Sequence, residues 1–299
     1  MLDYIKETDR LESIFLEVLD DTSKRELILY LLCYVQLIRK VGNVNIPLEQ
    51  FLRCASRNFI NMRNSWKDIL AEMNIFFISD LHGNTYTGKD IYRIDERGFH
   101  FISVHHKYCK DISSFSSKVV KYWGVINKVH HYGRSMTPYD AVYVSAIMFN
   151  EGLYEELLSY CEFQKERFRK EANFFDALSS LSLAYKKKES TIQHISDCLR
   201  KITPFGDVYY SINLEKLRRD LSKLLKKLQK GKSLENIKIE FVNGERNKES
   251  KWKRLIKGIK NIFRRIKGGK RWTLTTSETA CYYSIEDCSK KRKNFLMES

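Results

Sequence analysis

Proline and glycine are scarce in this sequence, which has three prolines and 13 glycines among 299 residues. Both residues interrupt helices, proline because it lacks an N–H group and glycine because its backbone is too free. Hydrophobic residues nevertheless make up 43% of the chain and aromatic residues 13%, enough to fill real cores. The composition therefore excludes a disordered chain. It predicts mainly α structure with short connections.

Paired cysteines and long apolar runs are also lacking. The seven cysteines include no C-x-x-C pair, so neither a disulfide framework nor a zinc ribbon is predicted. The longest apolar run, residues 27–38, spans about a dozen residues, well short of the ~20 that cross a bilayer. Asp3, Glu7 and Asp9 stand where a signal peptide would be basic and then apolar. We therefore expect a cytoplasmic protein.

Acidic residues are outnumbered, because 53 Lys and Arg face 37 Asp and Glu, a formal net charge of +16. Much of the excess lies between Arg246 and Arg271, where Glu249 is the single acid. A basic protein favours polyanionic partners, either nucleic acid or an anionic membrane surface. Charge alone does not choose between them.

The N-terminal third has the pattern of a helix, a turn and a helix. Ser23 and Glu26 have the spacing of a capping box, which predicts the start of a helix that runs to Lys40. A second, short helix is expected after Pro47, ending at Ala55, since proline is tolerated in a first helical turn.

A third helix is predicted over residues 61–73, where apolar residues recur on one face. They are Met62, Trp66, Ile69, Leu70 and Met73. The opposite face carries Asn61, Arg63, Asn64 and Lys67, residue types that bind base edges or phosphates when a helix lies in a major groove. The alternative is that this polar face is simply solvated.

Two strands joined by a long turn are expected next. Residues 75–78 and 91–94 have the composition of strands, and residues 81–89 between them contain glycine and asparagine. Residues 95–102 then predict the start of another helix, because acidic side chains favour a first turn. In this interpretation His82 and Lys89 on the turn, together with Arg57, contact phosphates.

The segments Leu70-Ala71-Glu72-Met73-Asn74-Ile75-Phe76 and Ile91-Tyr92-Arg93-Ile94-Asp95-Glu96-Arg97-Gly98 resemble the third helix and wing of the winged-helix DNA-binding superfamily. The resemblance covers about residues 24–105. It implies a winged-helix domain over residues 1–108 whose third helix enters a DNA groove. Many winged helices mediate only protein contacts, and that alternative remains open.

Catalysis is not predicted. Ile78-Ser79-Asp80-Leu81-His82-Gly83-Asn84 resembles the first motif of calcineurin-like metallophosphoesterases, but the later motifs of that family do not follow, and a metal pair needs more ligands than two. A second polar group does not have zinc spacing, namely His105, His106, Cys109, His130 and His131. We expect no catalytic residue, metal or cofactor, with a hydrolase at Asp80 and His82 as a rival.

A helical connector over residues 109–137 and a helical bundle over residues 138–232 are predicted next. The expected helices span residues 139–150, 154–170, 174–187, 191–201 and 214–229. Phe149 to Tyr154, Phe174 to Leu178 and Pro204 to Leu214 resemble domain-of-unknown-function family 309 in order and spacing. Leu158, Ser159 and Lys165 replace that family's His, Glu and Trp. The resemblance therefore implies a scaffold that binds partners or dimerises.

Residues 233–299 complete the chain with a predicted basic amphipathic helix. Its apolar stripe is Trp252, Leu255, Ile256, Ile259, Ile262, Phe263 and Ile266, and its cations include Lys253, Arg254, Lys257, Lys260, Arg264 and Arg265. Such a helix can follow a phosphate backbone, lie on an anionic membrane or dock on the chain's own bundle.

The sequence as a whole predicts a DNA-binding transcriptional regulator, with RNA as the alternative ligand and a homodimer as a further expectation. The rival is a scaffold or peripheral membrane protein that uses the basic helix.

Overall fold

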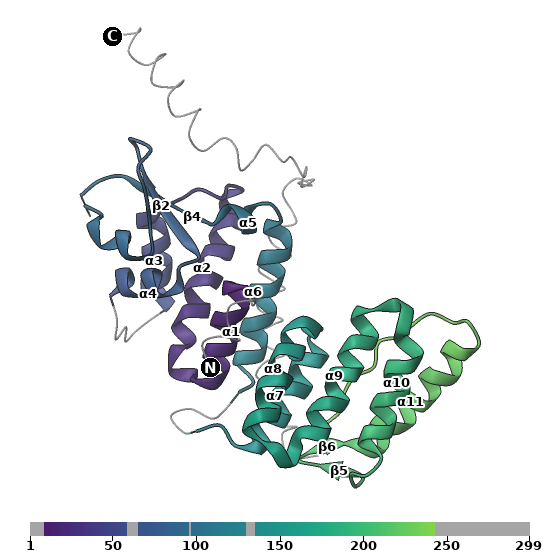
Figure 1. Cartoon of the computed structure of the whole chain (residues 1–299). Helices are drawn as coiled ribbons and strands as arrows, with labels where there is room; N and C mark the ends of the chain where they lie inside the picture. Colours follow the sequence, from purple (N-terminus) through teal and green to yellow (C-terminus); the bar gives the residue numbers. More distant parts are fainter. Residues whose placement is uncertain (1–8, 59–64, 96, 130–134, 243–299) are drawn as a thin grey trace, which may run out of the picture.

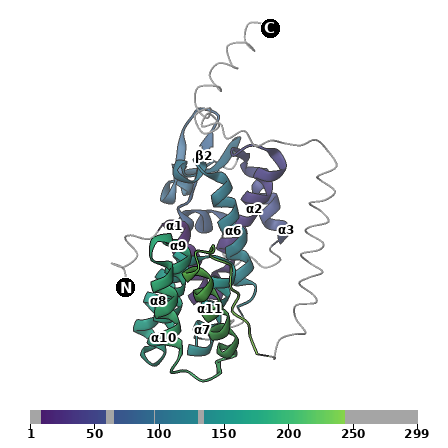
Figure 2. The same cartoon turned by 90° about the vertical axis from the view of Figure 1, so that its right-hand side faces the viewer.

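The computed structural model describes residues 9–58, 65–95, 97–129 and 135–242. In these ranges the chain is mainly helical and adds a small four-stranded antiparallel sheet and a two-stranded hairpin. The prediction of mainly α structure is thus confirmed. Figures 1 and 2 show two lobes, a purple-to-teal N-terminal lobe and a teal-to-green C-terminal bundle. Within the described ranges, no helix combines the length and the apolar character needed to cross a membrane.

The N-terminal lobe contains helices before, between and after the strands of its sheet. In order, its elements are α1 (Arg10–Asp20), η2 (Thr22–Arg25), α2 (Glu26–Val41), β1 (Ile46–Pro47), α3 (Leu48–Asn58), α4 (Trp66–Met73), β2 (Phe76–Asp80), β3 (Thr85–Thr87), η3 (Gly88–Arg93), β4 (His100–Val104), α5 (His106–Cys109) and α6 (Ile112–Ile126). The strand order is β1-β4-β2-β3, all antiparallel. Ile78 pairs with Ile102 on one side and with Tyr86 on the other. The chain therefore passes from helices α3 and α4 into a hairpin, and the strand that follows, β4, returns to β1.

Tyr34 joins the parts of this lobe. Its buried ring makes edge contacts with Phe51 of α3, Phe76 of β2 and Phe115 of α6. Its hydroxyl donates to the Val44 carbonyl at 2.7 Å and accepts from the Val104 amide at 3.2 Å. A buried tyrosine needs such polar partners, so the hydroxyl fixes the sheet against α2.

The start of α2 differs from the prediction. The capping box of Ser23 and Glu26 was wrong, because Asp21 caps the preceding 3₁₀ turn by accepting from the Ser23 amide at 3.0 Å. Ser23 donates its hydroxyl to the same carboxylate at 2.7 Å. The helix ends one residue beyond Lys40, where Gly42 takes the left-handed conformation that suits glycine.

Two expected elements after α4 were also wrong. Residues 88–93 form the 3₁₀ helix η3 rather than a strand, and residues 100–104 form strand β4 rather than a helix. The returning strand of the hairpin is β3, inside the segment expected to be a turn. The acidic residues at 95–96 suggested a first helical turn, but β4 is fixed by pairing with β2 over its whole length and with β1.

The C-terminal bundle matches the predicted helices closely. Its elements are α7 (Pro138–Asn150), α8 (Tyr154–Arg167), η4 (Arg169–Glu171), α9 (Ala172–Lys186), η5 (Lys188–Ser190), α10 (Thr191–Ile202), β5 (Val208–Tyr209), β6 (Ile212–Asn213) and α11 (Leu214–Gln229). Each helix packs on the next in sequence. On α11, Leu214, Leu217, Leu221 and Leu224 are buried, as the leucine spacing predicts.

Residues 233–242 belong with the bundle, beyond the expected boundary at residue 232. Tyr185 donates to the Glu235 carbonyl and accepts from the Ile237 amide, at 2.8 and 2.9 Å. Asn150 makes a matching pair of hydrogen bonds with the Ile239 backbone, both 2.8 Å. This extended segment therefore closes the face between α7 and α9. The basic segment predicted beyond it lies outside the described residues.

The two lobes meet through a buried polar contact. The rings of Phe15 on α1 and Tyr122 on α6 stack at 4.1 Å between centroids, and the Tyr122 hydroxyl donates to Glu156 of α8 at 2.6 Å. Lys118 lies 3.1 Å from the same carboxylate. Because Tyr122 and Glu156 are buried, this contact links the two lobes, and α6 contributes to the interface.

Candidate nucleic-acid interface

Helix α4 is held firmly at both ends. Ser65 caps it by accepting from the Lys67 and Asp68 amides, and Asp68 accepts in return from the Ser65 amide. At the other end, the Arg10 guanidinium donates to the carbonyls of Glu72 and Met73, at 2.7 and 3.1 Å. Cation and carbonyls complement each other there, because the C-terminal end of a helix is electronegative.

The outward face of α4 is tied to η3. Lys67 donates to the Ile94 carbonyl at 3.1 Å, and its ammonium lies 5.5 Å from the centre of the Trp66 ring. Tyr92 donates to Asp68 at 2.7 Å. The half-buried Lys67 is therefore engaged in fixing the loop that follows the hairpin.

The turn between β2 and β3 is organised by Asp80. Its carboxylate accepts from the backbone amides of His82 and Asn84, at 2.8 and 2.9 Å, and from the Asn84 side chain at 2.8 Å. Desolvation is the largest single influence on the pKa of Asp80 and raises it, but the hydrogen bonds from Asn84 and His82 together outweigh it and lower that pKa. Gly83, at φ 86°, supplies the left-handed residue that closes the turn.

The structure describes only some of the residues that were predicted to contact nucleic acid. His82 and Lys89 are exposed, the first on the turn and the second in η3 next to α4. Helix α4 begins at Trp66, so the prediction that it includes Asn61, Arg63 and Asn64 was wrong. Those three residues lie outside the described residues, as does the side chain of Arg57, although α3 contains its backbone. The same holds for Lys253, Arg254, Lys257, Lys260, Arg264 and Arg265.

The loop before β4 contains two exposed residues that were not predicted to contact nucleic acid. Arg97 is exposed, and Phe99 keeps 77% of its surface accessible, the most among the exposed large apolar side chains of the described ranges. An exposed cation two residues from an exposed ring suits nucleic acid, which offers phosphates and stacking bases. The sequence did not predict these two exposed side chains, because residues 95–102 were expected to form a helix rather than a loop and a strand. Residues 65–105 carry four Lys and Arg against six Asp and Glu, so the formal net charge of this segment is slightly negative.

Metal ligands do not gather in the described part of the chain, where no three His, Cys, Asp or Glu side chains lie close enough to hold an ion. Both carboxylate oxygens of Asp80 are used by its turn. His105 stands at the N-terminal end of α5, where burial lowers its pKa and the nearby Lys107 lowers it further. His130 and His131 lie outside the described residues.

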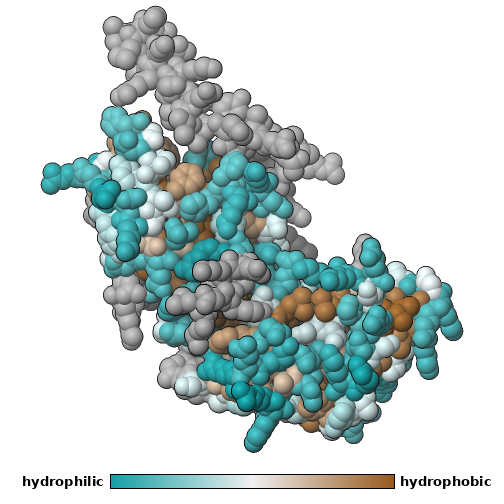
Figure 3. Space-filling model, viewed as in Figure 1, coloured by the Kyte–Doolittle hydropathy of each residue, from teal (hydrophilic) through white to brown (hydrophobic). Residues whose placement is uncertain are grey.

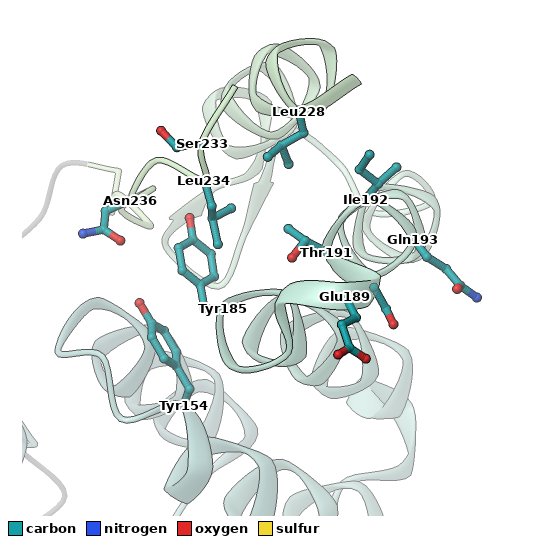
Figure 4. A pocket seen from close by; sticks show the side chains of 11 residues that line it. Tyr154, Tyr185, Glu189, Thr191, Ile192, Gln193, Leu228, Ser233, Leu234 and Asn236 are labelled. Atoms are coloured by element: carbon teal, nitrogen blue, oxygen red, sulfur yellow. The ribbon is translucent and has the colours of Figure 1, made fainter. Parts of the chain in front are cut away.

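A groove of about 960 Å³ opens on the bundle between the start of α10, the end of α11 and the segment after it (Figure 4). Its apolar part is formed by Tyr154, Tyr185, Ile192, Leu228 and Leu234. Figure 3 shows an apolar band on the bundle among hydrophilic side chains. Among the described residues, Glu189 is the one carboxylate that lines the groove, and no histidine, cysteine or lysine lines the groove. The groove therefore lacks the paired groups that acid–base chemistry requires.

Comparison with known proteins places the chain in a family without assigning it an activity. An uncharacterized protein of Aquifex aeolicus is 31% identical over 303 residues, an alignment that covers 100% of this chain and 96% of that protein. The chain belongs to the same family as that protein. No model of a known protein family matches the chain, and no solved structure matches it significantly.

Proposed function

We propose that this protein is a non-catalytic, nucleic-acid-binding protein whose N-terminal lobe is a winged-helix module. The order of elements carries the proposal. Helix α2, strand β1, helices α3 and α4 and a hairpin follow one another, and the last strand, β4, lies between β1 and β2. The resemblance to the winged-helix superfamily implies this arrangement, with α4 as the helix presented to a DNA groove and the 81–84 turn as the wing.

Duplex DNA is the favoured ligand and RNA the alternative. A transcriptional regulator is the natural role for such a module, and it would act in the cytoplasm. The bundle of α7–α11 then serves as a scaffold for a partner or for a second copy of the chain. Its resemblance to domain-of-unknown-function family 309, with the polar signature replaced, supports a role without catalysis.

Neutralising the exposed cations around η3 tests the module. We expect Lys89→Gln with Arg97→Gln to weaken binding of the full chain to a short duplex, because both substitutions remove a cation that would neutralise a phosphate. Fluorescence anisotropy against duplex DNA, single-stranded DNA and structured RNA measures the effect. The matched control is Lys170→Gln with Lys187→Gln, which removes the same charge from exposed positions on the bundle. Equal affinity of the two double variants would argue against a winged-helix contact.

A further inference from the structure

Among the described elements, α11 has the largest excess of Lys and Arg over acids, larger than that of the segment around the 81–84 turn. Residues 214–232 contain eight Lys and Arg and two acids, Glu215 and Asp220. This helix closes the bundle and is exposed along one side. Its cations are therefore paired within the chain, solvated or available to a partner.

Three of these cations are neutralised within the chain. Lys216 pairs with Glu240, Arg218 with Asp207 at 2.6 Å, and Lys227 with Glu235 at 2.7 Å. Arg218 also donates to the Phe205 carbonyl at 3.0 Å, so its role is to hold the loop before the hairpin. These three side chains fasten neighbouring segments to α11.

Four others form what we call the α11 cation row: Arg219, Lys223, Lys226 and Lys230. All four are exposed, and no carboxylate of the described residues forms an ion pair with any of them. The spacing of four and three residues places Arg219, Lys223 and Lys226 on one face of α11, opposite the buried leucines, and Lys230 directly follows the last residue of the helix. At about 1.5 Å per residue, the row extends for roughly 16 Å.

The residues next to the row indicate which kind of partner it suits. Its flanking positions on α11 are polar, such as Ser222 and Gln229, and no leucine of the helix lies on this face. An amphipathic helix that binds a membrane needs an apolar face to insert, and protein interfaces are depleted in lysine. A straight row of unpaired cations without apolar neighbours fits a regular line of anions.

We propose that the α11 cation row binds the phosphate backbone of nucleic acid without reading its sequence. This inference rests on the proposed function and deepens it, since it assigns phosphate binding to the bundle and leaves groove contacts to the N-terminal lobe. Phosphate contacts of this kind position a protein on a duplex and give binding a strong salt dependence. Residues 65–105 carry more acids than cations, so a second, basic surface would supply the phosphate neutralisation that the N-terminal lobe lacks.

The test compares salt dependence in the full chain. The row variant is Lys223→Gln, Lys226→Gln and Lys230→Gln, and glutamine keeps a similar helix propensity. The control variant is Arg169→Gln, Lys170→Gln and Lys187→Gln, three exposed positions elsewhere on the bundle that remove the same charge. Affinity for a duplex of arbitrary sequence is measured by anisotropy from low to moderate salt, and circular dichroism checks that both variants are folded.

We expect the row variant to reduce the slope of log K against log salt by about 0.9 for each phosphate that it no longer neutralises, roughly 3 for three phosphates. The control should keep the wild-type slope. Equal slopes for row variant, control and wild type would overturn the assignment. It would also be overturned if the row variant bound duplex normally but no longer bound phosphatidylserine vesicles.

The two proposals can fail separately. A lower slope in the row variant, with no effect of Lys89→Gln and Arg97→Gln, would support the row and refute the winged-helix contact. An unchanged slope in the row variant, with weaker binding by the Lys89→Gln and Arg97→Gln variant, would refute phosphate binding by the row and leave the winged-helix contact standing.

Discussion

Single residues decide the shape of the turn between β2 and β3. Asp80 accepts four hydrogen bonds, from two backbone amides, the Asn84 side chain and Tyr86. A carboxylate suits this position because it only accepts, and each of these four groups is a donor. The sequence motif around Asp80 and His82 is thus explained by the turn itself.

The Asp80 carboxylate makes the turn sensitive to acid. Its pKa is lowered by hydrogen bonds that exist only in the folded turn, so its stabilisation is present above the unfolded pKa and is lost as pH falls through the folded pKa. We expect the amide signals of His82 and Asn84 to shift together with the Asp80 carboxyl in an NMR titration. Asp80→Asn, which keeps one acceptor oxygen, should remove the titration and retain part of the turn. Titration of these amides in that variant would contradict the assignment.

Elements, rather than residues, set the orientation of the proposed contact helix. The capping box of Ser65 and Asp68 fixes where α4 begins. We expect Ser65→Ala to destabilise the protein by about 1 kcal/mol, the usual effect of removing an N-cap. Chemical denaturation measures it, with Ser222→Ala as control, since Ser222 only bonds back to the Arg218 carbonyl within α11. Equal effects of the two substitutions would show that the cap contributes nothing.

The success of sequence prediction also differs by element. The bundle helices were predicted well because leucine periodicity and a cap such as Thr137 before Pro138 act locally. Strand β4 and helix η3 were missed because non-local contacts decide them. Residues 100–104 become a strand by pairing with β2, and η3 is fastened to α4 by Tyr92 and Lys67. No local pattern signalled the α11 cation row as distinct from its paired neighbours, because the acids Asp207, Glu235 and Glu240 come from other segments.

At the scale of the whole molecule, the lobes are coupled by Tyr122 and Glu156. Removing the hydroxyl leaves a buried carboxylate with one hydrogen-bond donor fewer. We expect Tyr122→Phe to lower the free energy of unfolding by about 1–3 kcal/mol. The half-exposed pair of Lys128 and Glu151 provides the control, because Lys128→Gln should cost less than about 1 kcal/mol. A Tyr122→Phe effect no larger than that of Lys128→Gln would mean that the contact does not couple the lobes.

Two proposed contact surfaces on separate lobes imply that the protein uses its full length to hold nucleic acid. In the proposal, the N-terminal lobe would contribute α4 and the 81–84 turn, and the bundle would contribute the α11 cation row. A fixed interface between the lobes would hold both surfaces in one geometry.

Titration of the full chain with a short DNA duplex at several salt concentrations tests this account most directly. We predict measurable binding at about 50 mM salt and a steep linear fall of log K with log salt toward about 200 mM. The absence of binding to duplex DNA and to structured RNA at low salt would contradict it.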